Sequence, residues 1–337
     1  AQLDQQQLGT ELQVESTVKS VNRLAQDLAA VNQRILDTPR SGNTPNDLFD
    51  QRDQLISELN RYVQTSTVPS ENGAVSVFIS GSQPLVLGAT ANQLTFPAGT
   101  SPRELQFVQG STTIPINHKQ LGGGELTGLM TFLRDDLGGM KGQLDQLAFD
   151  LATEVNAQHR LGMGLDPNDV TPKNFFVPPP GSPLSSEGAA KSLQMALTAP
   201  NQLAAASPVL VEAGLGNSGG LSVESLHATS PFPSPFPTPN PEIVFNAAGQ
   251  YAISSGPLTS FSPGVPITGN GWSLTLRGSP GNGDTFTVRP PTPTESTSQN
   301  AGNANAILAL RDKAMANGVP LADGYVTVIS SLGTQVQ

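Results

Sequence analysis

The hydrophobic positions between residues 46 and 63 repeat with a period of seven. The apolar pairs that mark this repeat are Leu48/Phe49, Leu55/Ile56 and Tyr62/Val63. Such spacing places apolar side chains on one stripe of an α-helix and not on one face of a strand. The sequence therefore predicts a helix here, with Leu55 and Leu59 in a helical core.

A longer helix is predicted before it, at residues 3–36. Val14, Val21, Leu28 and Ile35 recur every seven residues, and polar residues fill most other positions. A helix of this length with one apolar stripe needs partner helices that cover the stripe. Residues 38–43 have the composition of a turn. The helix at 46–63 is therefore expected to return antiparallel to the first.

The hydrophobic period changes to that of strands between residues 68 and 117. One hairpin is predicted from strands at 74–79 and 84–88, and a second from strands at 105–110 and 112–117. Within each pair, the two β-prone runs are separated by only a few residues, as in hairpins. The region is expected to form a small β module.

Helical periodicity resumes after Gly122-Gly123-Gly124 and predicts a third helix to about residue 160. Its first apolar row contains Leu126, Leu133, Met140 and Leu147, and its second row contains Met130, Leu137, Leu144 and Leu151. A last helical stripe contains Tyr325, Val328, Ile329, Leu332 and Val336. This final helix is expected to pack back onto the first helices, because its stripe also needs a partner.

Residues 161–297 are rich in proline, glycine and short alternating runs. Strands are predicted at 242–246 and 251–254, and a closing hairpin from 271–278 and 284–290. Proline-rich stretches at 178–183 and 231–241 are typical of extended loops. The region is expected to form a β-rich outer domain.

These patterns predict an α+β multidomain chain in which β-rich outer domains are inserted into a long antiparallel helical bundle. The bundle domain is expected from residues 1–67, 118–160 and 298–337, the small β module from 68–117, and the outer domain from 161–297. The bundle core is predicted to contain Leu55, Leu59, Leu126, Leu133, Leu147, Leu151, Ile329 and Leu332.

Composition narrows the function classes. The chain of 337 residues has a formal net charge of −10, which argues against nucleic acid or an anionic membrane as its main partner. It contains no cysteine, so it has neither a disulfide framework nor thiol chemistry. No apolar run is long enough for a transmembrane helix. Both ends fall within helical patterns, so we expect a core fragment of a longer subunit.

The residues that could carry chemistry do not form a recognisable constellation. His118, His159 and His227 are far apart and lack metal-ligand spacing. His159 is expected to end a helix, where a cation would suit the helix dipole. Asp135 and Asp136 are expected on a solvated face or in ion pairs between helices. We therefore expect no enzyme activity, no cofactor and no metal site.

Two glycine-containing stretches have equally simple interpretations. Gly122-Gly123-Gly124 lacks the Lys-Ser/Thr of a phosphate-binding loop, so a hinge before the third helix is expected. Asp284 follows Gly281-Asn282-Gly283 and is expected to be a turn residue, because no calcium-loop pattern surrounds it.

Several phrases resemble the hook-associated protein 1 family of the bacterial flagellum. They are LFDQRDQLISEL at 48–59, GGELTGLMTFLRDDL at 123–137, LDQLAFDLATEVNAQH at 144–159 and NFF at 174–176. The resemblance implies a flagellin-like helical core and a structural subunit that joins the hook to the filament. It carries over no catalytic or cofactor-binding residue.

The same resemblance implies partners and a location. The expected partners are the hook protein, the other hook-associated junction protein, further copies in a ring when the subunit is full length, and a secretion chaperone for a C-terminal segment. The expected location is extracellular, in the flagellum, after export through the flagellar secretion channel. Two alternatives stay open: a flagellin or other filament protein, and a secreted adhesin or enzyme with a helical stalk.

Overall fold

The computed structural model describes residues 2–38, 45–99, 103–164, 173–181, 184–292, 295, 299–314 and 318–335. The side chains of residues 328, 329 and 331–335 lie outside that description. The chain divides into an N-terminal unit, residues 1–141, and a C-terminal unit, residues 142–337.

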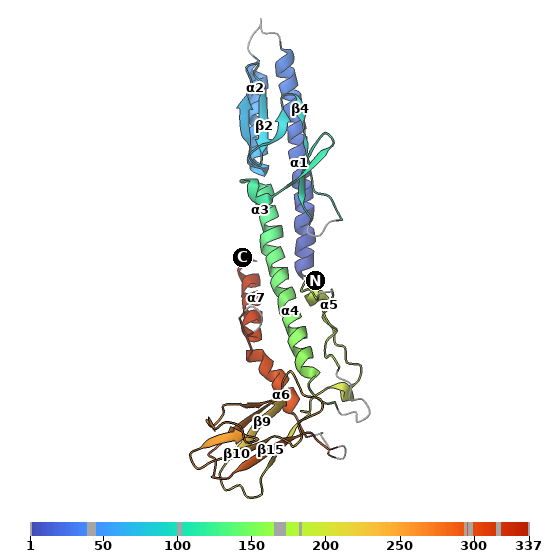
Figure 1. Cartoon of the computed structure of the whole chain (residues 1–337). Helices are drawn as coiled ribbons and strands as arrows, with labels where there is room; N and C mark the ends of the chain where they lie inside the picture. Colours follow the sequence, from blue (N-terminus) through green and yellow to red (C-terminus); the bar gives the residue numbers. More distant parts are fainter. Residues whose placement is uncertain are drawn as a thin grey trace. The chain divides into compact units, whose positions relative to one another are not determined.

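Two helices, α1 and α2, lie side by side in the N-terminal unit (Figure 1). α1 spans Gln2–Asp37 and α2 spans Asn46–Tyr62, which confirms both predicted helices and their packing against each other. The turn predicted at 38–43 lies outside the described residues from position 39 on. The cluster between them consists of Val31, Ile35 and Leu48, with Phe49 and Leu55 packed against it. The apolar stripes with a seven-residue repeat thus correctly predicted the faces that α1 and α2 pack against each other.

Two small antiparallel sheets follow α2 in the chain and precede the third helix. The first has the order β1-β2-β3-β4, with strands Ser66–Pro69, Val75–Ile79, Gln83–Leu87 and Thr90–Ala91. The second has the order β5-β6-β7, with strands Gln93–Thr95, Leu105–Gln109 and Thr112–Ile116. The predicted hairpins are confirmed as β2–β3 and β6–β7.

Asparagine side chains attach both sheets to α1. Nδ2 of Asn32 donates to the Val75 carbonyl at 2.8 Å, and its Oδ1 accepts from the Val75 N–H at 3.1 Å. Asn22 makes the same two bonds with Leu94, both at 2.8 Å. Each amide satisfies both backbone groups of a strand residue, as a neighbouring strand would.

The third predicted helix is present, but a π-helical stretch interrupts it. After the short 3₁₀ turn η1, His118–Gln120, the chain forms α3, Glu125–Thr131, the π-helical η2, Phe132–Leu137, and α4, Gly138–His159. The predicted rows are buried as far as Met140. Beyond it, Ala148, Ala152 and Val155 are buried, whereas Leu144, Leu147 and Leu151 are half-buried. A π-helical turn holds more residues than an α-helical turn, which a seven-residue count does not include.

The C-terminal unit adds shorter helices and 3₁₀ turns. They are α5, Ala189–Ser192; η3, Pro200–Gln202; α6, Gly302–Ala309; η4, Leu310–Asp312; and α7, Leu321–Gln335. In α7, Gly324 lies against α4: a Cβ atom there would be 3.4 Å from Cδ1 of Leu147.

The predicted stripe on α7 is wrong at the position that the structure describes. Tyr325 is 58% exposed, so it does not contribute to a buried core. The turn that carries it instead presents Gly324 to α4, where the small residue permits close contact. The side chains of Val328, Ile329 and Leu332, and the whole of Val336, lie outside the described part of the chain.

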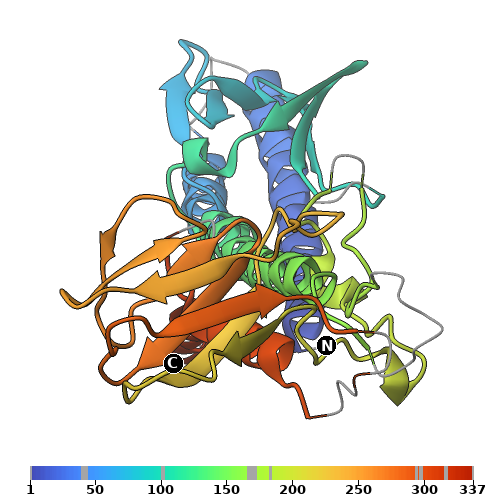
Figure 2. The ribbon, with the colours of Figure 1, turned by 60° about the horizontal axis from the view of Figure 1, so that its bottom comes forward.

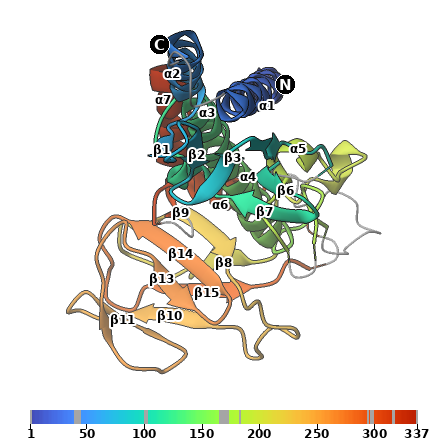
Figure 3. The same ribbon diagram turned by 90° about the horizontal axis from the view of Figure 1, so that it is seen from above.

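The strands of the C-terminal unit form two antiparallel sheets (Figures 2 and 3). One has the order β12-β11-β10-β15-β8 and the other the order β13-β14-β9. The strands are β8, Leu210–Ala213; β9, Ser222–Ala228; β10, Glu242–Phe245; β11, Gln250–Ile253; β12, Thr259–Ser260; β13, Ile267–Gly269; β14, Trp272–Arg277; and β15, Thr285–Arg289. The predicted strand pair β10–β11 is confirmed.

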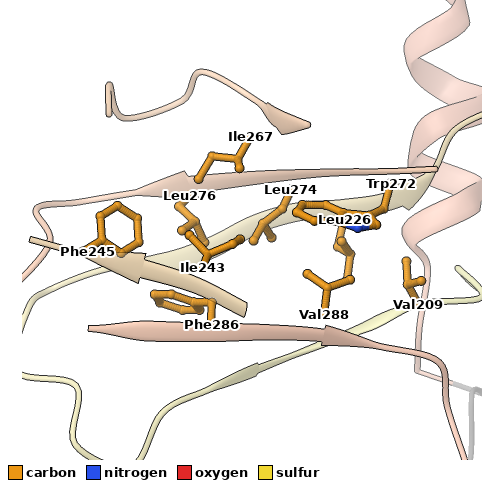
Figure 4. Packing of buried hydrophobic residues seen from close by; sticks show 10 residues of the cluster. All are labelled: Val209, Leu226, Ile243, Phe245, Ile267, Trp272, Leu274, Leu276, Phe286 and Val288. Carbon is orange, nitrogen blue, oxygen red and sulfur yellow. The ribbon is translucent and has the colours of Figure 1, made fainter. Parts of the chain in front are cut away.

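The core of this unit lies between the two sheets (Figure 4). Ile243 and Phe286 come from the five-stranded sheet, and Trp272 and Leu274 from the three-stranded sheet. All four are at most 2% exposed. The strands of this unit therefore form a β-sandwich, in which two sheets bury their inner faces against each other.

The predicted closing hairpin is wrong, because its two strands belong to different sheets. β14 pairs with β13 and β9, whereas β15 pairs with β10 and β8. Asp284, in the connection between them, is 1% exposed and accepts N–H groups from Ser218 at 2.7 Å and Gly281 at 2.7 Å. These bonds lower the pKa of Asp284. Asp284 thus ties the crossing to the β8–β9 loop, beyond its expected role in a turn.

Candidate functional site

The predicted bundle-core residues fall in both units. In the N-terminal unit, Leu59, Leu126 and Leu133 are buried, and Leu55 is half-buried. In the C-terminal unit, Leu147 and Leu151 are half-buried. The side chains of Ile329 and Leu332 lie outside the described part of the chain. A single core that contains all of them stays a prediction.

The end of α4 carries a buried histidine whose hydrogen bonds define its state. Nδ1 of His159 donates to the Lys173 carbonyl at 2.8 Å, and Nε2 accepts from the Ala204 N–H at 2.9 Å. An imidazolium has no acceptor, so this ring is neutral, with its proton on Nδ1. Burial lowers the pKa of His159. The prediction of a cationic His159 that suits the helix dipole is therefore wrong, because desolvation of the ring outweighs the dipole.

Two of the family-like sequence stretches, 144–159 and 174–176, are in contact. Asn156 donates to the Phe176 carbonyl at 3.0 Å and accepts from the Phe176 N–H at 2.8 Å. The ring of Phe175 lies edge-on to His159, with centroids 5.6 Å apart. The asparagine–histidine end of the helix and the phenylalanine pair thus form one polar and aromatic joint.

Further polar contacts extend this joint to α6 and to β9, where the Ala228 carbonyl accepts from Nε2 of Gln158 at 3.3 Å. Nε2 of Gln158 donates to Oδ1 of Asn303 at 2.8 Å, and Nδ2 of Asn303 donates to the Ala204 carbonyl at 2.6 Å. Gly162 lies so close that a Cβ atom there would be 2.1 Å from Nδ2 of Asn303. Sequence analysis missed Asn303, because nothing near it in the chain indicates a buried partner.

His118 and Asp135 line an open hollow in the N-terminal unit. Nε2 of His118 lies 3.2 and 3.3 Å from the two carboxylate oxygens of Asp135. The hydrogen bond from His118, helped by the charge of Lys119, lowers the pKa of Asp135. The hollow has a volume of about 580 Å³, and the apolar side chains of Leu105 and Met130 are among those that line it. Asp135 is therefore in an ion-pair cluster, one of the two environments expected for it.

Two other candidates from the sequence, His227 and the triple glycine, are explained by packing. His227 lies on β9, where burial lowers its pKa. Gly124 has a φ of 97°, and a Cβ atom there would be 2.6 Å from the Tyr62 carbonyl oxygen. The triple glycine therefore lets the start of α3 pass close to the end of α2.

Two findings on the described part of the chain concern metal ions and membrane spans. Within it, no group of three or more His, Cys, Asp or Glu side chains is placed to hold a metal ion. None of the helices described there combines the length and the hydropathy of a membrane-spanning segment. The candidate site described above is a set of packing surfaces and joints between elements.

Comparison with known proteins identifies similar chains. The model of the flagellar hook-associated protein FlgK helical domain matches residues 1–176. Flagellar hook-associated protein 1 of Salmonella typhimurium is 36% identical over 167 residues, and that of Escherichia coli K12 is 34% identical over 168 residues. Each alignment covers 48% of this chain and 30% of the relative.

A solved structure extends the similarity to the whole fold. The flagellar hook junction protein FlgK from Burkholderia pseudomallei aligns with 99% of this chain and 81% of its own, with a TM-score of 0.71 and 22% identity. This match shows the same fold, with its helices and β-rich parts. The chain covers under a third of the length of the curated relatives named above.

Proposed function

Because this chain belongs to the flagellar hook-associated protein FlgK family, we propose that it is a structural subunit of the junction between the flagellar hook and the filament. One observation carries the proposal: the family model matches residues 1–176, which include α1, α2, both small sheets and α4. The family is structural, and we propose no catalytic role for this member.

The packing of the N-terminal unit suits an adaptor that transmits force. Besides the asparagine bonds, Arg103 forms ion pairs with Glu15 at 2.7 Å and Glu11 at 3.3 Å of α1. Its guanidinium also lies 4.2 Å from the ring centroid of Phe96. Several contacts thus fix the small sheets to α1, so that a load on one element passes to the others.

We propose the following partners and arrangement for the subunit. It contacts the hook protein on one side and the other hook-associated junction protein on the other, and copies of it form a ring. A secretion chaperone binds a C-terminal segment before export through the flagellar channel to the cell exterior. Residues 1–67, 118–160 and 298–337 form one helical domain, which carries the β module 68–117 and the outer domain 161–297.

Deletion of the gene in the source bacterium tests the junction role. We expect hooks without attached filaments, with intact filament subunit released into the medium, because an adaptor is needed for attachment but not for synthesis. Electron microscopy of cells and immunoblots of the medium measure both results. Filaments that stay attached to hooks would contradict the proposal, and loss of the filament subunit itself would favour a flagellin.

Complementation with two matched variants links this phenotype to the fold. Leu59→Asp places a charge at a fully buried position of α2, whereas Ser57→Asp changes an exposed position two residues away. We expect Ser57→Asp to restore filament attachment and Leu59→Asp to fail. An adhesin or enzyme with a helical stalk would leave attachment normal in the deletion strain.

A further inference from the structure

The connection between β9 and β10 contains a tandem repeat. Its three tetrads are Ser230-Pro231-Phe232-Pro233, Ser234-Pro235-Phe236-Pro237 and Thr238-Pro239-Asn240-Pro241. Each begins with a hydroxyl residue and has proline at its second and fourth positions. Residues 229–241 are called the proline-rich segment below.

The segment is attached firmly to the β-sandwich. Phe232 and Phe236 pack against the sandwich core, with ring centroids 5.9 Å apart. The Thr229 N–H donates to the Gly271 carbonyl at 2.9 Å, and the Pro241 carbonyl accepts from the Val288 N–H at 2.9 Å. The segment is therefore held at both ends and by its two aromatic side chains.

The repeat divides the segment into an attached side and an exposed side. Phe232 and Phe236 are half-buried, whereas Ser230, Ser234 and Thr238 are exposed. No residue in the described part of the chain hydrogen-bonds the three exposed hydroxyl groups. The fold thus presents a row of free hydroxyl groups, four residues apart, on a fixed support.

We propose that Ser230, Ser234 and Thr238 are acceptor sites for O-linked sugars. Chains rich in serine, threonine and proline are typical substrates for O-glycosylation, because proline prevents helix and sheet formation and leaves the hydroxyl groups accessible. Attached sugars are bulky, polar and suited to a solvent-facing surface. They would cover this side of the sandwich with a hydrophilic layer.

The lack of basic residues in the proline-rich segment favours a neutral sugar over a phosphate as the attached group. The proline-rich segment contains no Lys, Arg or His, and the chain already has a net charge of −10. A phosphate adds about −1.5 to −2 charges and is stabilised by Arg or Lys partners. Three phosphates on this segment would repel one another, and the segment itself supplies no such partner, whereas a neutral sugar needs none.

The transfer itself needs a transferase and a sugar donor activated through phosphate. The hydroxyl oxygen forms a bond to the anomeric carbon, and the bond from that carbon to the donor phosphate oxygen breaks. The phosphate group leaves with the electron pair, and a base of the transferase takes the hydroxyl proton. The product is an O-glycosidic bond on Ser or Thr.

Peptide mass mapping of the full-length protein, purified from its source bacterium, tests the proposal. Cleavage after Glu224 and Glu242 isolates the peptide 225–242, which contains all three acceptors. We expect one to three sugar-sized increments, placed on Ser230, Ser234 and Thr238 by electron-transfer fragmentation. An unmodified peptide, or phosphate-sized increments, would overturn the proposal.

Variants expressed in the same bacterium locate the acceptors. We expect the triple variant S230A/S234A/T238A to lose every increment, while Trp272 fluorescence verifies that the sandwich remains folded. The control is Ser262→Ala, which changes an exposed Ser-Pro outside the repeat, on the separate peptide 243–295. Increments that persist on peptide 225–242 of the folded triple variant, or that depend on Ser262, would place the modification elsewhere and overturn the assignment.

Discussion

Gly269 faces the indole ring of Trp272 so closely that a Cβ atom there would lie 2.2 Å from Cε2 and Cζ2. Trp272 is fully buried in the sandwich core, and Gly269 pairs with it across the β13–β14 turn. The size of one residue in β13 thus fixes the position of the largest side chain in the core.

The first prediction is that Gly269→Ala destabilises the C-terminal unit. The added methyl group must displace the indole ring or the backbone, and overpacking of this kind costs about 1–3 kcal/mol. Trp272 is the only tryptophan, so the urea midpoint of its fluorescence reports on this unit. The control is Gly216→Ala, because a Cβ atom at Gly216 meets nothing within 4 Å. Equal midpoints for the two variants would contradict the prediction.

The second prediction is that Asn32→Leu loosens the first small sheet from α1. The leucine fills a similar space but leaves the buried N–H and C=O groups of Val75 without the bonds that Asn32 provides. Each such group costs about 1–3 kcal/mol when it lacks a partner. Urea unfolding followed by far-UV circular dichroism measures the loss.

Gln33→Ala serves as the control for Asn32→Leu. Gln33 is exposed and bonds only the side chain of Asp37 among the hydrogen bonds described for it, at 2.8 Å. Its substitution should change stability by no more than about 0.5 kcal/mol. If Asn32→Leu behaves like Gln33→Ala, the asparagine bonds do not hold the sheet.

The third prediction concerns acid. Burial lowers the pKa of His159 and of His227 below the ordinary value of 6.5. As pH falls through 6.5, the unfolded chain therefore binds protons before the folded chain does, and the free energy of unfolding decreases. The contribution of these two histidines to the free energy of unfolding should be fully present above pH 6.5 and should decrease as the pH falls below it.

The contribution of His159 can be separated from that of His227. Urea midpoints of Trp272 fluorescence at pH 7.5, 6.5 and 5.5 give the pH dependence for the wild type and for His159→Gln. The glutamine amide can still donate and accept, but it does not titrate. We expect a shallower decline in the variant, with the remainder due to His227. The same slope in both proteins would mean that His159 does not cause the acid sensitivity.

Local sequence patterns predicted most helices and strands, but they did not predict which strands pair when the partners are far apart in the chain. The β10–β11 hairpin was predictable because its strands are separated by only a few residues of chain. By contrast, β9 pairs with β14, which lies more than forty residues later, and sequence period does not identify such a partner. Alternation in β14 and β15 indicated two strands correctly but could not assign them to different sheets.

The buried asparagines that bond other elements could have been recognised from the sequence. In α1, Asn32 lies four residues after Leu28 and three before Ile35, in the middle of the buried row. A polar residue at a core position needs a hydrogen-bond partner, because its burial is otherwise costly. Asn156 and His159 break the buried face of α4 in the same way. Polar residues within an apolar row therefore indicate where other elements join a helix.

The last prediction tests whether the helices of both units share one domain. Leu126 is fully buried in the N-terminal unit, so Leu126→Ala should cost about 2–5 kcal/mol, and Leu147→Ala less, since Leu147 is half-buried. In a single bundle, both substitutions lower the same helical transition in far-UV circular dichroism. Leu8→Ala, at a position 59% exposed, is the control and should leave that transition unchanged. If Leu147→Ala shifts only the Trp272 transition while Leu126→Ala shifts only the helical one, the two units fold separately and the single helical domain is wrong.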